Sequence, residues 1–162
     1  VTTVHHEPVE LPRHKGPFPV DGLTIDDLRA AKRGTLHYQG IGLQSSGQYV
    51  CRAELNDVVL GDLPPAGGRE TEGVWSDASM ALSAEAIASR REWNHLEIEN
   101  PGQDWFKIGR FWIELELADG RKASSQITTG VYTQPPNWPY AEGKLVPFGE
   151  SIEVKIRFKI NP

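Results

Sequence analysis

The fold is decided by the stretch RFWIELEL, residues 110–117, in which large apolar residues occupy every second position from Phe111. Successive side chains of a β-strand point to opposite faces, so this alternation predicts a strand with one dry face. Residues 151–160 repeat the pattern, with five apolar residues alternating with four charged ones. Strands that are dry on one side favour antiparallel sheets, and two such sheets bury their dry faces against each other.

Further extended runs surround these two. We expect strands over 35–43 and 48–55, joined as a hairpin by the polar turn 44–47, then over 58–60 after the Asn56-Asp57 turn, over 93–99, and over 122–132 after the Asp119-Gly120 turn. Residues 24–31 predict a short helix capped by Thr24, and residues 78–90 predict one or two helical turns with Ser83 as the cap. The helices do not alternate with the strands, which argues against βαβ units.

The sequence therefore predicts an all-β protein, an antiparallel β-sandwich or jelly roll with one or two short helices. Residues 1–22 hold four prolines and are expected to form an extended N-terminal arm, followed by a single domain over 23–162. The chain begins with Val1, which fits a processed secreted protein or a piece of a longer chain. We expect a secreted or extracytoplasmic location.

Composition narrows the partners. The 162 residues are 38% hydrophobic and 24% charged, which is typical of a globular domain. The net charge is -5, and no cluster of lysine and arginine is long enough to follow a phosphate backbone, so nucleic acid is excluded as a partner. No apolar run approaches the roughly 20 residues that cross a bilayer.

The most unusual segment is GVYTQPPNWPYAEG, residues 130–143, which combines three prolines with three aromatic residues. Prolines stiffen the backbone, and aromatic faces beside amide and carboxylate groups suit sugar recognition. The predicted ligand surface consists of Trp138, Tyr140, Asn137 and Glu142, with Trp105 and Trp75 at other loop rims. The alternative is that Trp138 and Tyr140 cover one end of the core.

Three other sets of residues are candidates for a functional role. Trp112 shares the polar side of its strand with glutamates, so it needs a cover from its own chain, which we favour, from another subunit or from a ligand. The single cysteine, Cys51, is interpreted as a small buried apolar residue. Two carboxylate pairs, Glu97 with Glu99 and Glu114 with Glu116, could do acid–base chemistry but are interpreted as solvated sheet faces matched by Lys or Arg.

A structural calcium ion is possible, because five aspartates occupy turn-like positions, although their spacing does not single out a set of ligands. They are Asp57, Asp62, Asp77, Asp104 and Asp119. No nucleophile-elbow, zinc-protease, P-loop or dinucleotide motif occurs.

Two segments resemble galactose-binding-domain-like β-sandwiches. These are YVCRAELNDVVLG, residues 49–61, and LSAEAI, residues 82–87, followed by WNHLEIEN, residues 93–100. Together they span residues 49–100, about a third of the chain. The resemblance implies an eight-stranded jelly roll that serves as a carbohydrate-binding accessory module, sometimes with a structural calcium ion. In that family ligands often sit at the loop end, but loop 133–143 and the proline-rich start match no pattern of the family, so no ligand residue is carried over.

Three functions follow in order of preference. The first is a non-catalytic carbohydrate-binding module. The second is a structural or assembly domain that uses Trp112 and the proline-rich loop for protein contacts or self-association. The third is a small jelly-roll hydrolase that uses one of the carboxylate pairs.

Overall fold

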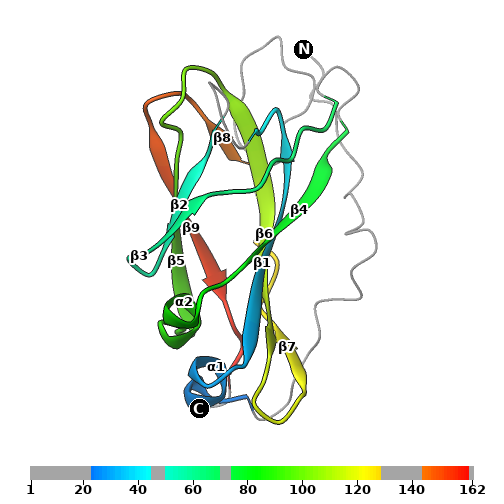
Figure 1. Ribbon diagram of the computed structural model, residues 1–162, viewed down its shortest axis with the longest axis vertical. Helices are drawn as coiled ribbons and strands as arrows, with labels where there is room; N and C mark the ends of the chain where they lie inside the picture. Colours follow the sequence, from blue (N-terminus) through cyan, green and yellow to red (C-terminus); the bar gives the residue numbers. More distant parts are fainter. Residues whose placement is uncertain (1–22, 45–49, 70–73, 129–143, 161–162) are drawn as a thin grey trace.

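The computed structural model describes residues 23–44, 50–69, 74–128 and 144–160, which form two antiparallel sheets packed face to face (Figure 1). The elements follow one another as α1 (Ile25–Arg29), β1 (Arg33–Ile41), β2 (Arg52–Leu55), β3 (Val58–Asp62), β4 (Ser76–Ala81), α2 (Ala84–Ala88), β5 (Trp93–Glu99), β6 (Phe106–Glu116), β7 (Lys122–Ser124), β8 (Lys144–Val146) and β9 (Ser151–Arg157). The predicted all-β sandwich with two short helices is confirmed.

Each sheet has its own strand order. The five-stranded sheet has the strand order β4-β1-β6-β7, and its fifth strand, β8, also pairs with β6. The four-stranded sheet runs β3-β2-β5-β9. The described residues thus form nine strands rather than the eight that the family resemblance implied, and β8 was not predicted.

The core lies between the sheets and is built by the alternating residues. In β6 and the residue after it, Phe111, Ile113, Leu115 and Leu117 all lie in the core cluster, as predicted. In β9 and beyond, Val154, Ile156 and Phe158 are core residues, while Ile152 and Ile160 pack at its margin. Cys51 is fully buried in the same cluster, so the prediction for this residue is confirmed.

Both helices lie at one end of the sandwich (Figure 1), and both caps are as predicted. The Thr24 hydroxyl accepts a hydrogen bond from the Asp27 backbone N–H, and the Asp27 side chain accepts one from the Thr24 backbone N–H. The Ser83 side chain accepts from the Ala86 N–H. Helix α1 is shorter than predicted, because it ends at Arg29 and Arg33 already opens β1.

Two local predictions are wrong. Runs 35–43 and 48–55 are not hairpin partners, because β1 pairs with β4 and β6 while β2 belongs to the other sheet. The chain therefore passes from one sheet to the other between Gln44 and Val50, and residues 45–49 of the predicted turn and second run lie outside the described residues. Residues 78–81 are not helical but form part of the edge strand β4, in which Ala78 and Met80 pack on the core and the residues between them do not.

A network of buried asparagines fastens the four-stranded sheet to α2. Asn56 and Asp57 have φ values of 50° and 68°, the left-handed conformation that a tight β2–β3 hairpin requires at both central residues. The Asn56 amide donates to Asn94 Oδ1 at 2.9 Å and to the Ser89 carbonyl at 3.0 Å. Asn94, fully buried in β5, also accepts from the Arg91 N–H and donates to the carbonyls of Arg91 and Ile156.

Candidate functional site

Polar side chains are buried on the outer face of the five-stranded sheet, the face that points away from the core. They alternate with core residues along β1 and β6, and they are His37, Gln39, Lys107, Arg110 and Trp112. Gln39 is 2% exposed and Arg110 is 4% exposed. Polar groups buried this deeply are held by specific contacts, so this face is more than a solvated surface.

A β-bulge places Arg110 on this face. His37 pairs with Trp112, whereas Gln39 pairs with Gly109, so two steps along β1 span three steps along β6. Arg110 has a φ of 52°, in the left-handed region that non-glycine residues rarely adopt. Bulges redirect a side chain and are common beside functional sites.

The redirected guanidinium starts a chain of short hydrogen bonds. Arg110 Nη1 donates to Gln39 Oε1 at 2.6 Å, and Gln39 Nε2 donates to Asp77 Oδ1 of β4 at 2.7 Å. Arg110 Cζ also lies 5.6 Å from the centroid of the Trp75 ring. We call Gln39, Trp75, Asp77 and Arg110 the Arg110 cluster. Each polar member fixes the orientation of the next, so the cluster is preorganised.

The next row of the same face stacks two rings. The rings of His37 and Trp112 lie 4.1 Å apart between centroids, with an angle of 13° between their planes. Trp112 is 1% exposed. The favoured prediction, that Trp112 is covered by its own chain, is confirmed, and the alternative prediction that Trp112 forms an assembly surface is wrong, because the indole has almost no area left for a partner.

An isolated antiparallel bridge between Arg69 and Val74 positions Trp75. The backbone N–H groups of Arg69 and Val74 each donate to the carbonyl of the other, at 2.8 and 2.9 Å. The Gly68 N–H donates to Ser76 Oγ at 2.8 Å, directly after Trp75. Gly68 has a φ of 58°, and a Cβ there would lie 2.3 Å from the Val74 carbonyl oxygen.

We expect Gly68→Ala to lower the free energy of unfolding by about 3 kcal/mol, because the new methyl group meets backbone and the left-handed conformation is strained. Chemical denaturation measures this loss. Gly67→Ala is the matched control, since no atom lies within 4 Å of a Cβ at Gly67. Equal stability of the two variants would contradict the role given to Gly68.

The structure brings together only part of the predicted ligand surface. Trp75 joins the Arg110 cluster. Trp105 is partly exposed, its backbone N–H donates to Asp104 Oδ1 at 2.8 Å, and no ring contact joins it to Trp75 within the described residues. The other four predicted residues, Asn137, Trp138, Tyr140 and Glu142, lie outside the described residues, as does the predicted arm 1–22.

Sequence reasoning missed Gln39, Asp77 and Arg110. Each is a single polar residue inside an otherwise ordinary strand or loop segment, and the sheet register that joins them is not visible in the sequence. The one signal was Gly109-Arg110, where the alternation of β6 is interrupted, a mark of a bulge.

Of the groups considered for catalysis and metal binding, only Asp77 belongs to the Arg110 cluster. Burial, together with the negative charges of Asp62 and Glu99, raises the pKa of the Cys51 thiol above its ordinary value, which disfavours the thiolate that a nucleophile needs. No three His, Cys, Asp or Glu side chains in the described ranges lie close enough to hold a metal ion.

The carboxylate pairs lie on opposite sheets. Glu116 forms an ion pair with Arg33 at 3.6 Å, as predicted, whereas Arg52, which lies opposite Glu99, forms its ion pair with Asp62 at 3.5 Å. Glu97 is exposed as predicted, but the prediction of a matching Lys or Arg is wrong, because its two cross-strand neighbours are Glu54 and Glu153.

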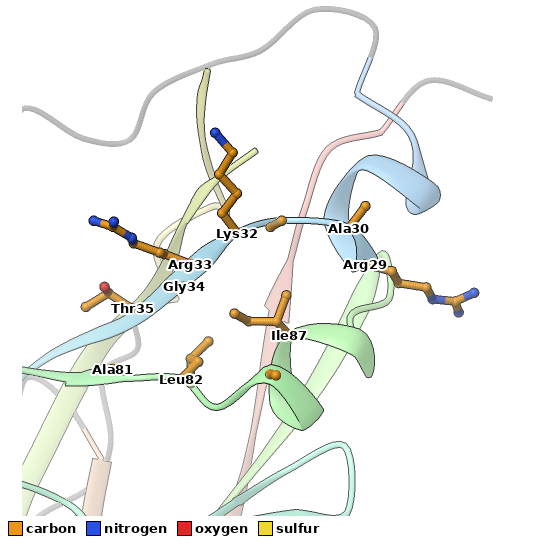
Figure 2. A pocket seen from close by; sticks show the side chains of 11 residues that line it. Arg29, Ala30, Lys32, Arg33, Gly34, Thr35, Ala81, Leu82 and Ile87 are labelled. Atoms are coloured by element: carbon orange, nitrogen blue, oxygen red, sulfur yellow. The ribbon is translucent and has the colours of Figure 1, made fainter. Parts of the chain in front are cut away.

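A pocket of about 400 Å³ opens between the α1–β1 segment and the β4–α2 segment. Leu82 and Ile87 line it between the two segments, whereas the side chains of Arg29, Lys32 and Arg33 point in different directions (Figure 2). Arg29 donates to the Arg90 carbonyl, and Arg33 pairs with Glu116. The cations do not converge on one point, so the pocket is not built for an anion.

Comparisons of this chain with protein-family models, with curated proteins and with solved structures found no match. Within the described ranges, neither helix is long and apolar enough to cross a membrane.

Proposed function

We propose that this protein is a non-catalytic, carbohydrate-binding accessory module of a secreted protein and that the Arg110 cluster belongs to its binding site. The observation that carries the proposal is the chain from Arg110 through Gln39 to Asp77 beside the Trp75 indole. It places donors, acceptors and an aromatic surface at one spot on a rigid sheet.

The chemistry of the cluster suits a polyhydroxylated ligand. Sugar hydroxyls need paired donors and acceptors, and the C–H face of a sugar ring packs on an aromatic ring. Trp75 is partly exposed and Asp77 is exposed, so both can reach a ligand in solution. Asp77 Oδ1 is held by Gln39, which orients the carboxylate before binding and reduces the entropy lost on association.

The resemblance to galactose-binding-domain-like sandwiches supports the same class of ligand. In that family ligands often sit at the loop end, whereas the Arg110 cluster lies on a sheet face. Asn137, Trp138, Tyr140 and Glu142 remain part of the proposal as a further ligand-binding segment, and Trp105 is proposed at its rim.

Binding is favoured over the two other functions for specific reasons. The assembly function was assigned to Trp112 and the proline-rich loop. Trp112 is buried against His37, and the loop lies outside the described residues. The hydrolase function needs a pair of carboxylates set for acid–base work, but Glu99 and Glu116 each lie beside an arginine on a sheet face.

A glycan array probed with the purified domain, with and without calcium, tests the proposal. For a glycan that is retained, we expect Trp75→Ala to weaken binding about 30-fold, the loss typical of a central aromatic contact. Isothermal titration calorimetry with that glycan measures the change.

Trp93→Ala is the matched control, because Trp93 also carries an arginine over its ring, with Arg157 Cζ at 5.0 Å, but lies on the opposite sheet. Its affinity should equal that of the wild type. Thermal unfolding shows that both variants are folded. Absence of binding to every glycan, or equal losses in the two variants, would contradict the proposed site.

A further inference from the structure

The outer face of the four-stranded sheet separates its charges along the strands. Because β5 and β9 are antiparallel, the start of β5 lies beside the end of β9. There Trp93 pairs with Arg157, whose guanidinium forms an ion pair with Glu92 at 3.0 Å, and His95 pairs with Lys155. Trp93 is 48% exposed. We call Trp93, His95, Lys155 and Arg157 the basic end of the face.

The next row toward the other end of the face is acidic, and the row beyond it holds Arg52 opposite Glu99. Glu54, Glu97 and Glu153 stand side by side on β2, β5 and β9, in direct register. Like charges directly opposite each other destabilise a sheet. Only Glu153 is relieved within its own chain, by His95 Nδ1 at 2.9 Å, whereas Glu54 and Glu97 make no ion pair in the described part of the chain. We call this row the acidic row.

We propose that this face binds the same face of a second copy of the chain, with corresponding strands of the two copies running in opposite directions. A twofold axis across the strands, at the level of Leu96 and Val154, exchanges the two ends of the face. Lys155 of each copy then faces Glu153 of the other, and the His95 row faces the Glu97 row. The two rows are two residues apart, about 7 Å, so one rotation satisfies both contacts at once.

A second copy fits better than a purely cationic partner, because the same face offers both signs of charge at the same spacing. Lys155 makes no ion pair in the described ranges and is available to a partner, whereas His95 and Glu153 exchange their contact within one chain for contacts with the second copy. The flat area of four short strands is roughly 400 Å², about half of what each partner contributes to a standard interface. The dimer is therefore weak and sensitive to salt.

Sedimentation velocity of the full chain over a range of concentrations, in low salt and in 0.5 M NaCl (about a 4 Å screening length), tests the proposal. We expect the weight-average mass to rise toward the dimer with concentration in low salt only. Glu153→Lys and Lys155→Glu should each weaken the dimer about tenfold, because like charges then meet. The double variant Glu153→Lys with Lys155→Glu has the wild-type composition and should restore the wild-type affinity.

Glu85→Lys, on the exposed side of α2, is the control for the change in net charge and should leave association unchanged. A monomer at every concentration overturns the proposal. The proposal is also overturned if the single charge reversals leave the dimer intact, or if the double variant does not recover the wild-type affinity. Either result would mean that a different surface or partner is involved. Sugar binding at the Arg110 cluster is on the opposite sheet, so its success or failure is read independently.

Discussion

Asn94→Ala is expected to lower the free energy of unfolding by about 4 kcal/mol. Asn94 is fully buried, and its side chain makes four hydrogen bonds, two as donor and two as acceptor. Alanine would leave the Arg91 N–H and the carbonyls of Arg91 and Ile156 without this partner, and the bond to the Ile156 carbonyl is fully buried. Urea or guanidinium denaturation measures the loss.

Glu97→Ala is the control on the same strand and should change stability little or raise it slightly, because Glu97 is exposed between two other carboxylates. A loss of less than about 1 kcal/mol for Asn94→Ala would contradict the role of the network.

Asn94→Asp separates hydrogen bonding from volume within the same experiment. Its carboxylate would face the carbonyl oxygens of Arg91 and Ile156, so the pKa in the folded state would lie above the unfolded value of about 3.9. The unfolded chain then ionises first as the pH rises, and stability is lost between the two pKa values. The variant should be closer to the wild type at pH 4 than at pH 7, each compared with the wild type at the same pH.

Trp112→Ala should cost a similar amount, about 4 kcal/mol, because it empties a fully enclosed site and removes the stack with His37. Thermal and chemical unfolding measure the loss. Trp93→Ala is the control, since the exposed Trp93 is expected to cost less than about 1 kcal/mol. If Trp112→Ala remained as stable as the wild type, the ring would not be enclosed as described.

The class of fold follows from the sequence because burial acts on every second residue of a strand. Residues 111–117 and 152–160 therefore carried a clear signal, and the caps at Thr24 and Ser83 were equally local. Pairing between strands was harder to predict. Nothing in residues 44–47 distinguishes a hairpin turn from a crossing between sheets, and the small residues of β4 resemble a helix because alanine favours helices.

The candidate site was only partly predictable for the same reason. Trp75 could be identified by its chemistry alone, as a large aromatic residue in a loop. Gln39 and Asp77 gain their significance from lying in register across β1 and β4, and Arg110 gains its position from a bulge. Trp112 shows the limit of alternation, because the polar side of a strand is not always the wet side.

The lone thiol of Cys51 has a consequence for how the protein tolerates its surroundings. With one cysteine, the chain forms no internal disulfide, and the sandwich is held by non-covalent contacts. Since the sulfur is enclosed between the sheets, oxidants and alkylating reagents reach it only when the layers separate. The rate at which the Cys51 thiol is modified therefore reports how often the sandwich opens. In an oxidising medium the thiol of the closed form stays unmodified.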